Sequence, residues 1–221
     1  MQSPFDNPDA AKAMAEADVM HRPGMADQLM RELAPLLAAE DIDIENTDEL
    51  DLATLQAALD RAVERRNLEL STPIGERRER ACVVLLLAAG AIGDDEQLLA
   101  ESLVWGVQPE PSDPDEPSVA NVIGVALGEL DGWFTDPELE RGLIELRVPE
   151  TLPGGVRAAI DILALARKGR AFGSIDALIR RHRGLKVLEG AALAVAAALM
   201  ALAAKTHDTV TKVGVRLLID S

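Results

Sequence analysis

Two long stretches of uncharged, apolar residues constrain this chain most strongly. Residues 81–92 read ACVVLLLAAGAI, and residues 190–204 read GAALAVAAALMALAA. Alanine and leucine dominate both stretches, and these residues favour a helical backbone because they lose little side-chain freedom in it. The longer stretch falls short of the roughly 20 apolar residues that cross a bilayer. We therefore expect two helices, at residues 81–92 and 187–204, buried at the centre of the fold.

The remaining sequence favours the same fold class. Aromatic residues make up 2% of the chain and Tyr is absent, so the side chains that stabilise strands are scarce. Further helices are expected from Asp51, from Asp94 to Trp105, from Ser118 to about Leu130, and from Asp136 to about Leu146, each with an N-cap residue at its start. The prediction is an all-α fold, an irregular orthogonal bundle of about nine to ten short helices around the two central ones.

A candidate boundary lies at residues 107–117. The run contains four prolines and four acidic residues, which is the composition of a loop. We expect a single domain over residues 1–221, or two packed lobes, 1–106 and 118–221, joined by this loop. At the C-terminus, residues 209–219 suit a helix by the spacing of their apolar positions and a strand by their β-branched content, and we choose the helix.

Charge and cysteine content narrow the environment and the partners. The formal net charge of −16 disfavours binding to nucleic acid or to an anionic membrane, since both carry negative charge. Cys82 is the single cysteine, which fits a reducing compartment. The first residues are acidic and show no secretory pattern. We therefore expect a cytoplasmic protein that binds neither a specific nucleic acid nor a membrane.

Motifs that would identify an enzyme are missing from the sequence. It contains no nucleophile elbow, no phosphate-binding loop and no dinucleotide-binding glycine pattern. The acidic residues 41–52 fail as a calcium loop because Asn46 and Leu52 occupy the glycine and glutamate positions. His21, His182 and His207 lie far apart and show no metal-binding spacing. We predict no catalytic residue, no metal site and no cofactor.

One candidate interface follows residue 118. Gly124, Gly128 and Gly132 recur at every fourth position, and small residues at this spacing let another helix approach closely. The partner helix is either part of the same fold or part of a second copy in a homodimer. Trp133 and Phe134 follow at once, and aromatic residues are common anchors in contact surfaces.

A second candidate surface is basic. Residues 156–221 carry eleven basic and five acidic residues, whereas residues 1–155 carry eleven basic and thirty-three acidic ones. The cations either balance acidic neighbours within the fold or form a face for an acidic protein or a phosphate-bearing ligand. The residues concerned are Arg167, Lys168, Arg170, Arg180, Arg181, His182, Arg183 and Lys186.

Taken together, these patterns favour a non-enzymatic interaction or regulatory protein that binds a protein partner or a second copy of itself. A small-molecule-binding helical domain, with a pocket between the two central helices, is the alternative. A third hypothesis is an enzyme whose carboxylates converge only in the folded chain.

Overall fold

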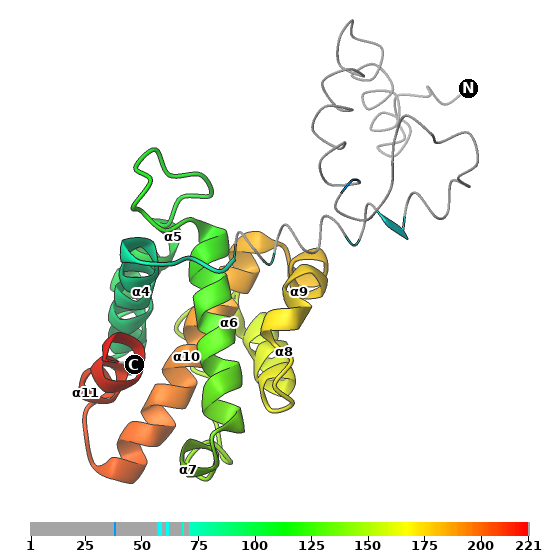
Figure 1. Ribbon diagram of the computed structural model, residues 1–221. Helices are drawn as coiled ribbons and strands as arrows, with labels where there is room; N and C mark the ends of the chain where they lie inside the picture. Colours follow the sequence, from blue (N-terminus) through cyan, green and yellow to red (C-terminus); the bar gives the residue numbers. More distant parts are fainter. Residues whose placement is uncertain (1–37, 39–56, 59–60, 62–67, 69–70, 221) are drawn as a thin grey trace, which may run out of the picture. The chain divides into compact units, whose positions relative to one another are not determined.

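A computed structural model describes residues 38, 57, 58, 61, 68 and 71–220 (Figure 1). The chain divides into two compact units, Met1–Arg65 and Arg66–Ser221. The helix expected from Asp51 and the acidic residues 41–52 fall almost wholly outside the described residues, and so does His21. Whether residues 1–221 act as one domain stays a prediction.

The all-α prediction is confirmed. The described part of the chain contains eight α-helices and no strand, with short 3-10 and π-helical turns between or after them. The helices are α4 (Glu76–Gly93), α5 (Gln97–Trp105), α6 (Val119–Thr135), α7 (Pro137–Glu140), α8 (Val156–Ala166), α9 (Ile175–His182), α10 (Gly184–Thr206) and α11 (Val210–Gly214). The preference for a helix at the C-terminus is also confirmed, because a π-helical turn, Val215–Ile219, continues α11.

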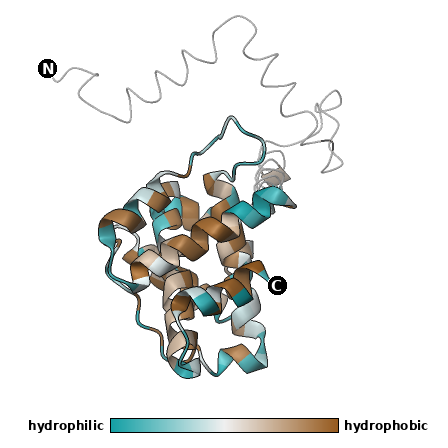
Figure 2. Ribbon diagram, turned by 90° about the vertical axis from the view of Figure 1, so that its left-hand side faces the viewer, coloured by the Kyte–Doolittle hydropathy of each residue, from teal (hydrophilic) through white to brown (hydrophobic). Residues whose placement is uncertain are grey.

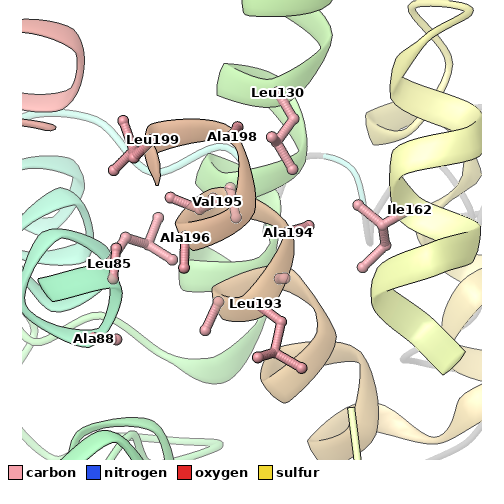
Figure 3. Close-up of a cluster of buried hydrophobic side chains, with 14 of the residues drawn as sticks. Leu85, Ala88, Leu130, Ile162, Leu193, Ala194, Val195, Ala196, Ala198 and Leu199 are labelled. Atoms are coloured by element: carbon pink, nitrogen blue, oxygen red, sulfur yellow. The ribbon is translucent and has the colours of Figure 1, made fainter. Parts of the chain in front are cut away.

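Helix α10 forms the centre of the bundle. It contacts α4, α5, α6, α8, α9 and α11, and every residue from 187 to 199 is buried. Figure 3 shows α10 passing between Leu85 of α4, Leu130 of α6 and Ile162 of α8. By length and composition α10 is the one described helix that could cross a membrane, but most of its apolar stretch is enclosed by other helices. The predicted central helix is therefore confirmed.

Helix α4, the other predicted central helix, is enclosed on one side only. Its buried residues, such as Leu85 and Ala88, face the core, whereas Val83 and Leu87 are 42% and 52% exposed. Complete burial of α4 was expected because residues 81–92 are apolar on every side of the helix. The difference arises because α5, α6, α10 and α11 cover part of the helix surface and leave one stripe free.

Three predicted N-cap residues, Ser118, Asp136 and Asp94, can be compared with the observed helix ends. Ser118 begins α6 as predicted, since its side chain accepts from the Asn121 backbone N–H and the Asn121 side chain accepts from the Ser118 backbone N–H. Asp136 also caps α7 as predicted, but that helix ends at Glu140. The prediction for Asp94 is wrong. This residue terminates α4, because its N–H bonds to the carbonyl of Gly90, and α5 begins three residues later, at Gln97.

Helices α4, α6, α8 and α10 all begin at the same end of the bundle (Figure 1). Arg77 in the first turn of α4 donates from Nε to the carbonyl of Pro114, in the loop before α6, at 2.8 Å. The start of α8 lies against Glu189 in the second turn of α10, because a Cβ on Gly155 would come within 2.5 Å of the Glu189 Cβ. The loop 107–117 projects from this end and is hydrophilic (Figure 2).

Candidate binding groove between α8 and α9

A surface groove of about 330 Å³ runs between α8 and α9. Asp161 in the middle of α8 contacts Arg181 and His182 at the end of α9, and the later groove residues of α8 lie opposite the start of α9, so the second helix runs back along the first. Each side of the groove supplies residues at positions i, i+3, i+4 and i+7, the spacing of one helix face. The lining residues are Asp161, Ala164, Leu165 and Lys168 on one side and Ser174, Ala177, Leu178 and Arg181 on the other.

The floor of the groove is apolar and open to solvent. Leu178 is buried beneath it, Leu165 is half-buried, and Ala164 and Ala177 are exposed. One turn before Ala164 on the same helix, Ile160 is 54% exposed. Alanine side chains are short, so another backbone can approach this floor closely.

One end of the groove is closed by an ion-pair cluster. The Oδ2 atom of Asp161 lies 2.7 Å from Nε2 of His182 and 3.0 Å from Nη1 of Arg181. The His182 side chain is 13% exposed and the Arg181 side chain is 70% exposed. The histidine therefore ties α9 to α8, while the guanidinium of Arg181 keeps most of its surface for a ligand. Lys168 places a second exposed cation at the other end.

The groove does not assemble a nucleophile with a base. Ser174 lines it, but eight residues separate Ser174 from His182, which corresponds to roughly 12 Å along a helix at 1.5 Å per residue. A hydroxyl that is activated by an imidazole must lie within hydrogen-bond reach of it. The arrangement suits binding, with an apolar trough and cationic side chains at its rim.

The predicted basic cluster is divided among several places. Lys168 and Arg181 both line the groove, at its opposite ends. Arg167 lies over the ring of Phe134, 5.8 Å from its centroid, and donates to the carbonyl of Ile144 at 3.0 Å. Lys186 donates to both carboxylate oxygens of the buried Glu189 at 3.1 Å. His182 pairs with Asp161, as described above, and the remaining members, Arg170, Arg180 and Arg183, are exposed.

The three glycines of the predicted interface, Gly124, Gly128 and Gly132, differ in how closely other residues approach them. A Cβ on Gly124 would lie 1.8 Å from the carbonyl oxygen of Ser71, so this glycine is needed for contact within the fold. A Cβ on Gly128 or Gly132 would meet nothing within 4 Å. Trp133 and Phe134 are 4% and 5% exposed and belong to the core, so their rings offer no surface for a partner in this conformation.

A cavity of about 270 Å³ opens beside Gly128. Its wall contains an ion pair between α4 and α6, with Nη2 of Arg78 lying 2.6 Å from Oε1 of Glu129. Burial raises the pKa of Glu129, although the nearby guanidinium of Arg78 opposes this shift. Glu129 is the one carboxylate that lines this cavity, so the pair of acids that an enzyme of the third hypothesis needs is not found in it.

A larger cavity of about 640 Å³ lies under the loop 107–117. Besides the loop, it is lined by residues 72–77 and by the start of α6. None of the three cavities described here is lined by a residue of α10, so the pocket expected between the central helices is not among them. Within the described part of the chain, no three acidic, histidine or cysteine side chains are grouped closely enough to hold a metal ion.

Most of the groove was not predicted from the sequence. The cations Lys168 and Arg181 were candidates, but the apolar floor and Asp161 were not. The available signal was the matched spacing on two neighbouring helices, 161, 164, 165 and 168 against 174, 177, 178 and 181.

Comparison of the chain with known proteins found no matching family model, no matching curated protein and no matching solved structure.

Proposed function

We propose that this chain is a non-enzymatic, cytoplasmic interaction protein that binds an acidic amphipathic helix of a protein partner in the groove between α8 and α9. One observation carries the proposal: two helices present an open apolar floor at matched helical spacing, with exposed cations at both ends. Grooves of this kind accept the apolar face of a partner helix in many complexes.

The floor favours a helix over a small ligand. Ala164 and Ala177 lie in the middle of the groove floor, one from each helix, and expose short side chains. Large apolar side chains at positions i, i+3, i+4 and i+7 of a partner helix would fill the space that these alanines leave. The exposed Ile160 extends the same apolar surface along α8.

The rim favours negative charge on that partner. Lys168 and Arg181 stand at opposite ends of the groove. Among the described residues, the exposed guanidinium of Arg181 pairs with one carboxylate, that of Asp161. Carboxylates that flank the apolar face of the partner would pair with these cations. Such pairs contribute more to the choice of partner and to the rate of association than to affinity.

Binding of a synthetic amphipathic helix to the full-length protein tests the proposal. The probe is a labelled peptide of about three heptads, with Leu at the a and d positions and Glu at e and g. Fluorescence anisotropy should show saturable binding. A peptide with Lys in place of each Glu should bind more weakly, because the groove rim is cationic.

Two pairs of variants locate the binding. Ala177→Glu places a charge on the groove floor and should weaken binding by about tenfold or more, whereas Ala204→Glu, the same change at an exposed alanine of α10, should not. Lys168→Glu should weaken binding more than Lys205→Glu, at an exposed lysine of α10. Equal losses within each pair, or no binding of the Glu peptide to the wild type, would refute the proposal.

A further inference from the structure

The end of the bundle where α4, α6, α8 and α10 begin carries opposite charges on its two halves. The loop 107–117 and the first turn of α4 together are called the acidic half. The end of α9, Arg183 and the first turn of α10 together are called the basic half. The acidic half contains two basic residues, Arg77 and Arg78, and six acidic ones, Glu76, Glu79, Glu110, Asp113, Asp115 and Glu116. The basic half contains Arg180, Arg181, Arg183 and Lys186.

Contacts within the chain hold the acidic half in place but do not neutralise it. Arg77 bonds to the carbonyl of Pro114, and Arg80 pairs with Glu76 at 2.5 Å and with Asp113 at 3.5 Å. Glu110 and Glu116 are exposed and form no ion pair within the part of the chain that the structure describes. The cavity of about 640 Å³ beneath the loop therefore has a negative lining with room for several side chains.

The basic half adds positive charge to the positive ends of two helices. The N-terminus of a helix carries a partial positive charge from its unbonded N–H groups. The N-cap residues of α8 and α10 are Gly155 and Arg183, and neither provides a side-chain cap. By contrast, Ser118 caps α6, and α4 has Glu76 and Glu79 in its first turn. On the basic half, Arg181 and Lys186 are paired with Asp161 and Glu189. Arg183 forms no ion pair within the part of the chain that the structure describes.

The carboxylate of Glu189, next to the basic half, is buried and hydrogen-bonded within the fold. Glu189 is 1% exposed, and its side chain accepts from Lys186 and, at 3.0 Å, from Nε1 of Trp105. The bond to Trp105 joins the last residue of α5, next to the acidic loop, to the beginning of α10. The acidic and basic halves therefore lie side by side at one end of the same molecule (Figure 1).

Arg183 is the most prominent group of the basic half. It is exposed and links α9 to α10 with φ 69° and ψ 149°, a conformation that residues with a Cβ rarely adopt. The chain reverses direction at this residue, so its charge stands at the end of the bundle and away from the faces where helices pack.

We propose that this end of the bundle binds a second copy of the chain, with the basic half of each copy against the acidic half of the other. A two-fold dimer requires one surface patch that is complementary to itself after rotation. A patch with adjacent halves of opposite charge meets this requirement. The cavity under the loop 107–117 then receives basic side chains from the α9–α10 connection of the other copy. This surface is separate from the floor of the α8–α9 groove.

Charge reversal in the full-length protein tests the dimer. Sedimentation velocity of the wild type should show association that increases with protein concentration and decreases with salt. Glu110→Lys/Glu116→Lys, and separately Arg180→Glu/Arg183→Glu, should each raise the dissociation constant by at least about tenfold, because like charges then face each other. Glu138→Lys/Glu140→Lys on α7 makes the same change in net charge at exposed positions outside the patch and should leave association unchanged.

A mixture of the two patch variants provides the decisive observation. In the mixed dimer, the introduced lysines of one copy face the introduced glutamates of the other at one contact. At the second contact the native Arg180 and Arg183 face the native Glu110 and Glu116. Association should therefore return although each variant alone is monomeric. Restoration cannot result from misfolded variants. A wild type that stays monomeric at every concentration, a mixture that does not associate, or an equal loss in the α7 variant would overturn the proposal.

Discussion

The two faces of α8 are built from similar residues but have opposite roles. On the inner face, Gly155 and Ala158 lie so close to Glu189 and Gly190 of α10 that a methyl group on either glycine would fall within 2.6 Å of a neighbouring atom. On the outer face, Ala164 lines an open groove of about 330 Å³. The comparison shows that small residues build a tight core where another helix meets them and a receptive surface where none does.

This difference sets the order of expected effects. Substitutions at the inner contact should cost the most stability, because well-packed interiors cannot accommodate added volume. Substitutions on open faces should change stability little and should alter binding instead.

Gly190→Ala should produce the largest effect. The new methyl group would lie 2.6 Å from Cβ of Ala158 and 2.8 Å from the backbone nitrogen of Ala159, so α8 and α10 would have to move apart. We expect a loss of about 1–3 kcal/mol in the free energy of unfolding, measured by urea denaturation followed by circular dichroism. Unchanged or increased stability would show that the inner contact is looser than described.

Gly128→Ala is the matched substitution at an open position. A Cβ here meets nothing within 4 Å, and Gly128 lies inside α6. Alanine should raise the free energy of unfolding by up to about 1 kcal/mol, because it favours the helix over glycine. The same urea measurement decides the outcome. A clear loss of stability would mean that another part of the protein covers this face of α6.

Asp161→Asn probes the closed end of the groove. The substitution keeps the shape of the side chain and removes the charge that Arg181 and His182 share. Stability should fall by no more than about 1 kcal/mol, because the Arg181 side chain is largely exposed to solvent. Affinity for the Glu-containing peptide should rise, since a negative charge leaves the groove. Weaker peptide binding, with Glu140→Gln on α7 as the charge-matched control, would contradict the assignment of the groove.

The partly buried ion pair of Arg78 and Glu129, between α4 and α6, gives the smallest expected effect. Burial raises the pKa of Glu129 above its usual 4.5, so the folded state holds this proton more tightly than the unfolded state. Stability should therefore fall as the pH rises from about 4.5 through the raised pKa of Glu129, and Glu129→Gln should remove that part of the slope. Urea denaturation across this pH range tests it, and an unchanged slope in the variant would refute the assignment.

Local chemistry explains which parts of the fold could be predicted. The apolar run that became α10 and the caps at Ser118 and Asp136 depend on neighbours within a few residues, and the structure contains all three. Asp94 is acidic and lies close before α5, where an N-cap was expected. Its backbone N–H instead donates to the carbonyl of Gly90, so Asp94 ends α4. The choice between these roles depends on where α4 stops, which a cap residue alone does not reveal.

The candidate site was harder to predict because it depends on tertiary contacts. Ala158 and Ala164 are the same residue on the same helix, and only the position of α10 makes one buried and the other exposed. Trp133 was an attractive anchor by its residue type, yet it lies in the core. The cations of the basic cluster were visible in the sequence, but their division between the groove, the core edge and the α9–α10 connection was not.

Hydrogen–deuterium exchange of the full-length protein, with and without the Glu-containing amphipathic peptide, tests the central claim most directly. If the outer face of α8 and the facing side of α9 form a receptive groove, the peptide should slow exchange within residues 156–182 and leave the buried helix α10 unchanged. Slowed exchange confined to other helices, or no change at saturating peptide, would contradict the assignment of this face as the binding surface.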